Sequence, residues 1–180
     1  MKPITDFLKS KRLALEIRKA DHADELFDLF CEKDLYQYIC RDIPESKEWL
    51  RKGIERAESL LSDDGKEIWL GWVGKELSTG KPVGVFEITI INSEAFVAYT
   101  VFKPYWKKGF AVEATQTIME FIKCNYETSR FVIEMDTRNW ASIKVAQKLG
   151  FEFVKVQNNV SFVKNFVSHE FQFQKICSNN

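Results

Sequence analysis

Pro104-Tyr-Trp-Lys-Lys-Gly-Phe-Ala-Val-Glu113 is the stretch that decides the fold of this chain. It follows a strand-like run at 95–102 and opens a helix-like run at 112–124. A strand, a glycine-containing turn with free backbone N–H groups and a helix N-terminus together form a site suited to an anion. Such a unit holds a pyrophosphate without a large basic patch, so it predicts a phosphorylated cofactor.

Composition points to a globular protein of balanced charge. Hydrophobic residues make up 45% of the 180 residues, which is enough for a sizeable core, and this length is typical of one domain spanning 1–180. The chain has 26 basic and 26 acidic residues. Nothing in this bulk charge favours nucleic acid or an anionic membrane as a partner.

Cysteine spacing and hydropathy bear on metal binding and location. The cysteines at 31, 40, 124 and 177 form no Cys-x-x-Cys pair and are too widely spaced for a ribbon or finger zinc site, so we expect no metal. The first residues lack the apolar segment of a signal peptide, and no apolar run approaches the ~20 residues of a membrane span. Free thiols in such a chain are typical of the cytoplasm.

The remaining pattern alternates between the periods of helices and strands. Runs at 12–18, 68–73, 83–91, 95–102, 130–137, 151–156 and 169–176 predict strands, whereas 157–168 fits either a loop or a strand. Asp21 is placed to cap the first helix, Pro44 lies near the start of the second, and Asn139 is placed to cap the last, which ends before Gly150. The order β-α-α-β-β-β-α-β-α-β-β describes a mixed α/β sheet of about seven strands.

This order and two local motifs resemble the GNAT superfamily of acetyl-CoA-dependent N-acetyltransferases. Trp106-Lys-Lys-Gly-Phe-Ala111 looks like the pyrophosphate loop of that family, and Asn139-Trp-Ala-Ser142 with Lys148-Leu-Gly-Phe151 is similar to its Asn-x-x-Ser helix. The opening at 11–24 is similar to the branch containing the ribosomal-protein N-terminal acetyltransferases. The resemblance covers about 12–176 and implies a mostly antiparallel sheet with helices on both faces. A Rossmann fold fits less well, because Gly-x-Gly-x-x-Gly is absent.

The resemblance implies acetyl-CoA as the cofactor and assigns residues to it. The loop amides face the pyrophosphate with the help of the helix dipole, and the two lysines either add charge near phosphate or are ordinary solvated lysines. An oxyanion site is implied at a backbone amide near 101–103, on a strand that diverges from 130–137. The implied cofactor-binding residues are Val101, Phe102, Lys103, Trp106, Lys107, Lys108, Gly109, Phe110, Ala111, Asn139 and Ser142.

Acetyl transfer needs a neutral amine and a stabilised thiolate leaving group. Ser142 is the candidate acid, because it lies one turn into the helix where the resemblance places the cofactor sulfur; the alternative is a local backbone contact. Glu87 is the candidate base, since burial would raise its pKa, and the alternative is a charge on a solvated face. Glu94, Tyr99 and His169 are weaker candidates for the base, and water relayed to solvent is another.

Three positions depart from the family pattern. Trp106 stands where the loop often begins with Gln or Arg, Ala146 where many relatives carry a tyrosine, and Phe96 where many of this branch carry an acidic residue. The acceptor is expected to contact 28–61, the meander connections and 157–168.

These observations predict an acetyltransferase, monomeric or homodimeric, that uses acetyl-CoA. The expected acceptor is a primary amine, preferably the N-terminal α-amino group of a protein or peptide. A small-molecule amine is the alternative acceptor, and a catalytically decayed acyl-CoA-binding module is the alternative of another class.

Overall fold

The computed structural model describes residues 7–163 and 166–177. The strands are β1 (Phe7–Lys9), β2 (Leu13–Ile17), β3 (Glu67–Glu76), β4 (Pro82–Ile91), β5 (Glu94–Val101), β6 (Arg130–Asp136), β7 (Glu152–Val163) and β8 (Phe166–Ile176). The α-helices are α1 (Ala23–Phe30), α2 (Lys47–Glu58), α3 (Phe110–Asn125) and α4 (Trp140–Lys148), with short 3-10 turns η1 (Ala20–His22), η2 (Lys33–Tyr36) and η3 (Lys103–Tyr105).

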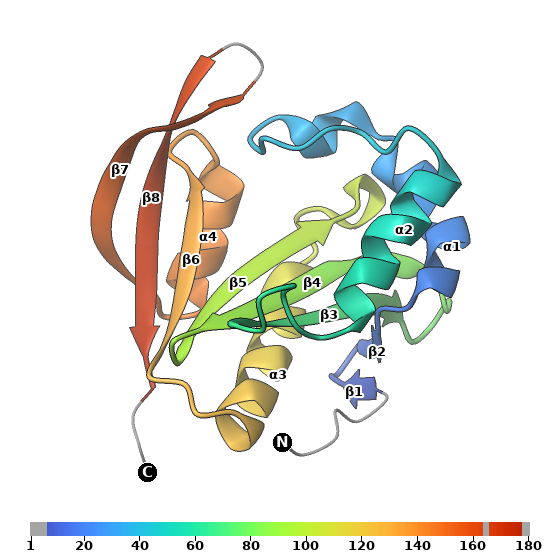
Figure 1. Cartoon of the computed structure of the whole chain (residues 1–180), viewed down its shortest axis with the longest axis horizontal. Helices are drawn as coiled ribbons and strands as arrows, with labels where there is room; N and C mark the ends of the chain where they lie inside the picture. The colour runs from blue at the N-terminus through green and yellow to red at the C-terminus, as the bar shows by residue number, and fades with distance from the viewer. Residues whose placement is uncertain (1–6, 164–165, 178–180) are drawn as a thin grey trace.

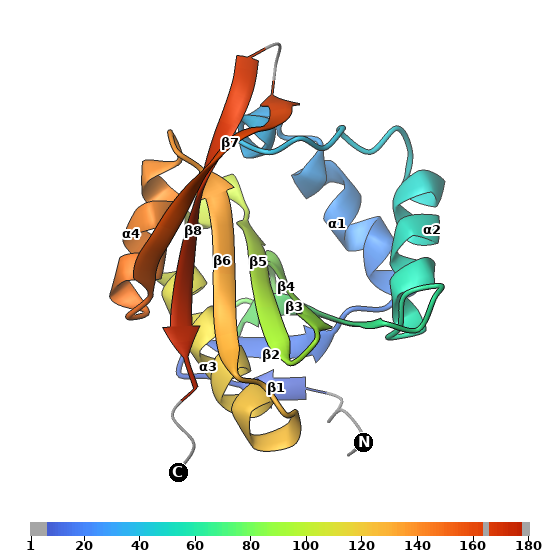
Figure 2. The same cartoon turned by 60° about the vertical axis from the view of Figure 1, so that its left-hand side comes forward.

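All described strands join one sheet in the order β1-β2-β3-β4-β5-β6-β8-β7 (Figure 1). Only β5 and β6 pair in parallel, and the other neighbours are antiparallel. Figure 2 shows α1 and α2 on one side of the sheet and α3 and α4 on the other. The predicted mixed, mostly antiparallel sheet with helices on both faces is therefore confirmed, with eight strands in place of about seven.

The differences from the sequence prediction lie at element ends. β1 was not predicted, because a strand of three residues is too short to show a period of two. The ambiguous 157–168 lengthens β7 and β8 into a long hairpin, apart from 164 and 165, which lie outside the described residues.

Two helix starts also differ from the prediction. Asp21 does not cap α1, because it lies within the 3-10 turn η1, where the ring of His22 accepts the Lys19 N–H at 2.9 Å. α2 begins after Ser46, whose hydroxyl accepts the Trp49 N–H at 3.0 Å, so the helix starts later than Pro44 suggested. Asn139 does cap α4, as predicted, and Gly150 follows that helix with a φ of 76°.

The two faces of the sheet are packed unequally. The larger core lies under α3, which buries Phe110, Ala114, Ile118, Met119 and Ile122 at helical spacing. The smaller core under α1 comprises Leu26, Val73, Val85 and Phe102. Since a fully buried large apolar side chain contributes roughly 1.5–3 kcal/mol, most of the stability comes from the α3 side. The α1 and α2 side is less filled and contains the cleft described below.

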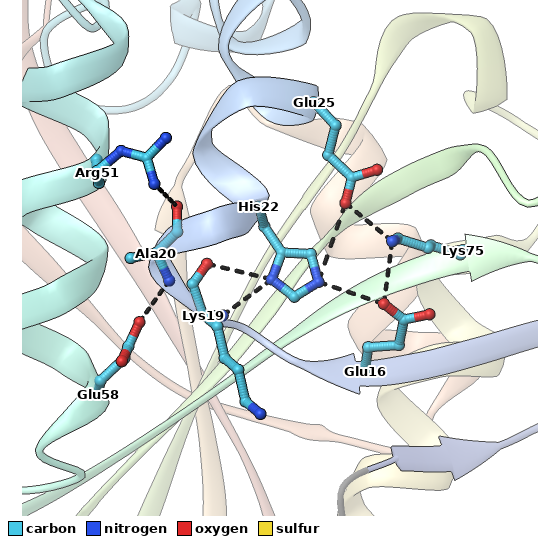
Figure 3. Close-up of polar contacts among 8 residues, drawn as sticks. All are labelled: Glu16, Lys19, Ala20, His22, Glu25, Arg51, Glu58 and Lys75. Carbon is cyan, nitrogen blue, oxygen red and sulfur yellow. Dashed lines mark hydrogen bonds and ion pairs between the residues drawn. The ribbon is translucent and has the colours of Figure 1, made fainter.

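A polar network ties α1 and α2 to the edge of the sheet (Figure 3). Lys75 on β3 lies 3.0 Å from Glu16 on β2 and 2.9 Å from Glu25 on α1, and the His22 ring lies 3.3 Å from Glu16. Arg51 on α2 donates to the Ala20 carbonyl at 3.4 Å, and Glu58 accepts from the Ala20 N–H. The network therefore fixes both helices to the strands beside them.

Strands β5 and β6 pair over a short distance and then separate. Their register covers only Glu94 with Arg130, Ala95 with Phe131 and Phe96 with Val132. β5 continues to Val101 and β6 to Asp136, so within the described residues the second half of each strand has no partner on the facing side. This divergence, which the family resemblance implied, opens the sheet beside the C-terminal end of β5.

Candidate functional site

The predicted phosphate loop lies where β5 ends and α3 begins. After η3 the chain reverses through Lys107, with a φ of 61°, and Gly109, with a φ of 83°, and the helix starts at Phe110. The indole Nε1 of Trp106 donates to the Val101 carbonyl at 2.6 Å. Trp106 therefore fixes the loop to the end of the strand, which accounts for a tryptophan at a position where a hydrogen-bonding side chain was expected.

The loop presents several backbone N–H groups that have no partner. Among the described residues, no N–H of 107–109 donates to another group, and the first N–H groups of α3 have no intrahelical acceptor. The αL conformation at Gly109, the N-cap of α3, favours glycine. Unpaired amides at a helix N-terminus form a site for an anionic group.

Arg12, the residue before β2, contacts this loop and the first turn of α3. Its guanidinium donates to Glu113 at 2.7 Å and to the Lys108 carbonyl at 3.1 Å, and it lies 4.2 Å from the centre of the Phe110 ring. Burial acts to raise the pKa of Glu113, but hydrogen bonds from Ser10 and Arg12 outweigh it and lower that pKa. The carboxylate is thus charged at neutral pH and holds Arg12 in place.

Backbone directions on β5 determine which amides face the opening beside β6. The Phe102 N–H donates to the Val83 carbonyl at 2.8 Å, so Phe102 cannot supply the implied oxyanion amide. Because N–H directions alternate along a strand, the N–H groups of Tyr99 and Val101 point away from β4, towards the gap. The side chain of Phe102 is also buried, against Phe30 with ring centres 5.3 Å apart.

The first turn of α4 lies close to β5. The Asn139 side chain accepts the Ser142 N–H at 3.1 Å, whereas the Ser142 hydroxyl donates no hydrogen bond among the described residues. Burial raises the pKa of Tyr99 to about 12, against a smaller lowering by contact with the Ser142 side chain. The Tyr99 hydroxyl is buried and has no hydrogen-bond partner in the described part of the chain. The hydroxyl groups of Tyr99 and Ser142 therefore lie close together.

A cleft of about 590 Å³ lies on the opposite face, between the sheet and the α1–α2 segment. Its floor comes from β3, β4, β5 and β6, and its walls come from 30–57. Both aromatic and charged side chains line it. The lining includes Phe30, Tyr36, Trp49, Trp69 and Phe96, together with Arg18, Arg41, Asp42, Glu87 and Glu134.

Glu87 lies in this cleft rather than beside Ser142. Arg18 crosses the face of Gly71, where a Cβ would approach its guanidinium to 3.2 Å, and reaches the Glu87 carboxylate at 2.7 Å. Burial acts to raise the pKa of Glu87, but the charges of Arg18 and Arg41 outweigh it and lower the pKa. The expected raised pKa is therefore wrong, and the role of Glu87 as a base stays a prediction.

Carboxylates also gather at the end of β6. Asp136 is 2% exposed, accepts from Arg138 at 2.8 and 2.6 Å and from the buried Ser168 at 2.8 Å, and its pKa is lowered to about 2, chiefly by the bond from Arg138. Glu134 lines the cleft. Burial raises the pKa of Glu170 on β8, and the nearby charges of Glu134 and Asp136 raise it further. Arg138 offsets the charge of Asp136, so Glu134 is the carboxylate that this end of β6 presents to the cleft.

Sequence reasoning missed several residues of this site. The run at 12–18, which was assigned only a structural role, begins with Arg12 and ends with Arg18. No local sequence pattern marks Arg41, Asp42 or Glu134 as residues of the site. The other base candidates lie elsewhere: Glu94 pairs with Arg130 at 2.6 Å, and the His169 ring contacts the Asn158 side chain at 3.1 Å. In the described ranges, no group of three or more His, Cys, Asp or Glu side chains is arranged to hold a metal ion.

A family model described as the acetyltransferase (GNAT) domain matches residues 12–152. The chain belongs to the GNAT acetyltransferase family. Its fold is similar to that of RimL, a ribosomal L7/L12 α-N-protein acetyltransferase solved in complex with coenzyme A, with a TM-score of 0.83 and 20% identity over 94% of this chain and 97% of RimL. It is also similar to a ribosomal-protein-S5-alanine acetyltransferase from Vibrio fischeri, with a TM-score of 0.82 and 16% identity over 94% of this chain and 96% of that one.

The same family appears among curated proteins. An uncharacterized N-acetyltransferase, p20 of Bacillus licheniformis, is 23% identical over 152 residues, which are 81% of this chain and 82% of p20. The GNAT protein described here is therefore an acetyltransferase, and acetyl-CoA is its acetyl donor. The predicted family, fold and cofactor are confirmed.

The residues present fit acetyl-CoA. The unpaired amides at 107–109 suit its pyrophosphate, the gap between β5 and β6 gives room for its extended arm, and the unpartnered Tyr99 hydroxyl lies at the far end beside Ser142. No helix in the described residues is both long and apolar enough to cross a membrane.

Proposed function

We propose that this GNAT protein acetylates the N-terminal α-amino group of a protein or peptide. The shape of the cleft carries this proposal. The cleft crosses the four neighbouring strands β3 to β6. Three inter-strand spacings make about 14 Å, which is the length of about four residues of an extended peptide. A monoamine of a few carbon atoms would leave most of this length empty.

The charges of the cleft support the same acceptor. Asp42, Glu87 and Glu134 lie along it and attract a cationic chain end, while Arg18 and Arg41 are placed to meet carbonyl or acidic groups further along a peptide. Trp49, which is 46% exposed, offers a surface for an apolar side chain. Two structural relatives are described by name as acting on ribosomal proteins, which is consistent with a protein acceptor.

In this proposal the cofactor is held by the backbone of the loop and of β5. The amides of 107–111 bind the pyrophosphate, whereas the Trp106 N–H donates to the Lys103 carbonyl at 3.2 Å and Trp106 contributes by fixing the loop. Lys107 and Lys108 add charge, and Gly109 allows phosphate to approach closely. The N–H of Val101 points into the gap and is suited to stabilise a developing oxyanion. The Lys103 N–H is proposed as a further hydrogen-bond donor to the cofactor. Asn139 orients the first turn of α4, because its side chain accepts the Ser142 N–H.

The proposed proton transfers depend on the pKa of the acceptor amine and on the groups around it. An α-amino group has a pKa of about 7.7–8.0, so part of it is neutral at pH 7–8. The lowered pKa of Glu87 makes it a weak base, and we therefore propose that solvent takes the proton while Glu87 orients the amine. The Ser142 hydroxyl is proposed to donate a hydrogen bond to the thiolate leaving group, which takes its proton from solvent. The free thiols are consistent with a cytoplasmic protein.

A panel of acceptors tests the proposal. Release of the CoA thiol is measured with hexapeptides beginning with Ala, Ser or Met, with the same peptides blocked at the N-terminus and carrying a free lysine, and with spermidine and kanamycin. We expect kcat/KM to be at least about tenfold higher for free N-termini, because the cleft accommodates the extended chain. Mass spectrometry of the products locates the acetyl group.

Peptide length supplies the matched control. With dipeptides, tetrapeptides and hexapeptides of one series, kcat/KM should rise to about four residues and then level off, as the spacing of β3 to β6 requires. Turnover confined to spermidine, kanamycin or blocked peptides would contradict a peptide N-terminus as the acceptor.

A further inference from the structure

Five buried side-chain N or O atoms in the described residues have no hydrogen-bond partner: Trp72 Nε1, Tyr99 OH, Thr115 Oγ1, Tyr126 OH and Arg130 Nε. Such atoms are uncommon in folded proteins, because an unpaired buried polar group costs free energy. Tyr99 is the one on the second half of β5, three residues beyond the last residue that pairs with β6. Its hydroxyl is therefore a buried donor beside a gap in the sheet.

The surroundings of this hydroxyl are fixed by the fold. The Tyr99 ring packs against the larger core, together with Val101 of the same strand. Ser142 approaches it from the first turn of α4, whose position is set by the Asn139 cap and by Ile143 and Ala146, both buried. Ala146 is fully buried, and an alanine offers no hydroxyl from that position of α4.

We propose that Tyr99 is a catalytic residue that donates a hydrogen bond to the cofactor sulfur, alongside Ser142, as the thioester breaks. This inference rests on the proposed placement of acetyl-CoA between the loop at 106–111 and the first turn of α4. It assigns a role to the unpartnered hydroxyl, and it accounts for a site that lacks a tyrosine at position 146.

The proton balance makes Tyr99 a hydrogen-bond donor rather than an acid. The acceptor nitrogen forms the C–N bond as the C–S bond breaks, and the C–S electron pair passes to sulfur. One proton leaves nitrogen and one reaches sulfur through solvent. The phenol keeps its own proton, because its pKa of about 12 lies well above the value of about 8.5 for a free thiol.

Binding calorimetry at pH 7 to 9.5 tests the role without turnover. Coenzyme A is compared with desulfo-coenzyme A, which lacks the thiol, on the native protein and on Tyr99→Phe. A hydrogen bond to a thiolate favours the charged form, so the native protein should prefer coenzyme A increasingly as pH rises. In Tyr99→Phe we expect that preference at pH 9 to fall about tenfold, with desulfo-coenzyme A bound as before.

Tyr126→Phe is the matched control, because it removes another buried hydroxyl that has no partner in the described residues, at the C-terminal end of α3. It should leave both affinities and kcat unchanged. Tyr99→Phe should also lower kcat about tenfold on the best acceptor of the panel, with KM for acetyl-CoA unchanged. Ser142→Ala should give a loss of the same kind.

The outcomes separate this inference from the proposed function. Equal pH dependence of coenzyme A binding in the native protein and in Tyr99→Phe would overturn the role of Tyr99 and leave the acetyltransferase site standing. An equal loss in Tyr126→Phe would also overturn it. Failure of the native protein to bind either ligand would overturn the cofactor placement together with the role of Tyr99.

Discussion

The cofactor loop and the acceptor cleft of this GNAT protein are built in different ways. The loop is one continuous segment from Val101 to Glu113, and it offers backbone N–H groups whose directions follow from a strand end, an αL glycine and a helix start. The cleft collects side chains from Arg18, from β3 to β6 and from the α1–α2 segment, which are far apart in the sequence. A site made of backbone depends on few side chains, whereas a site made of side chains depends on each one.

The largest effect is expected at Gly109, where the backbone site has its one residue-specific requirement. Gly109→Val places a β-branched residue at a φ of 83° and puts a side chain beside the amides of the loop. A Cβ there would meet only Arg12, at 3.6 Å, so the effect should fall on the ligand rather than on packing. We expect the rise in Tm that acetyl-CoA causes in the native protein to disappear, with a loss of affinity of about 100-fold or more.

Gly65→Val separates loss of the ligand from backbone strain. Gly65 has a φ of 70° in a turn with open space around it, so this variant carries a similar strain away from the loop. It should lower Tm while keeping the shift with acetyl-CoA. A full shift with acetyl-CoA in Gly109→Val would show that the loop is not the phosphate site.

The same contrast explains what could be predicted from the sequence. The loop, the Asn139 cap and Gly150 were found because each depends on neighbours within a few residues. The start of α2 was placed too early, because Pro44 is suited to a first helical turn, whereas the structure begins the helix after Ser46, whose side chain caps it. β1 is held by pairing with β2, and three residues give no pattern of their own.

The cleft could not be predicted in the same way. Glu87 was recognised as a candidate, but the direction of its pKa was wrong, because Arg18 reaches it across Gly71 from another strand. The charge next to a carboxylate decides its pKa as much as burial does. Tyr99 was only a weaker candidate, since the sequence does not show that its hydroxyl lacks a partner.

The next largest effect is expected at Asp136, the buried carboxylate at the end of β6. Its folded pKa of about 2 lies below the ordinary 3.8, so its contribution to stability is present above the unfolded pKa and is lost as pH falls towards 2. Asp136→Asn should lower the free energy of unfolding by roughly 2 kcal/mol at pH 7 and by little at pH 2, as measured by urea unfolding. The exposed Asp63, paired with Arg56 at 2.7 Å, is the control, and Asp63→Asn should change stability little. Parallel pH profiles for the native protein and Asp136→Asn would contradict this assignment.

The smallest effect is expected at Glu87, which tests whether the cleft binds the amine or deprotonates it. Removal of a general base typically lowers kcat by about 100-fold or more, whereas removal of one carboxylate that orients a cation mainly raises KM. Because Arg18 and Arg41 keep the pKa of Glu87 low, we expect Glu87→Gln to raise KM for a peptide about tenfold and to leave kcat within about threefold. The pH profile of kcat should not move.

Glu134→Gln, on the other side of the cleft and away from Arg18, is the matched change and should raise KM alone. A fall in kcat of two orders of magnitude in Glu87→Gln, with the loss of an ionisation from the pH profile, would instead make Glu87 the base and give the side-chain half of the site its own catalytic group.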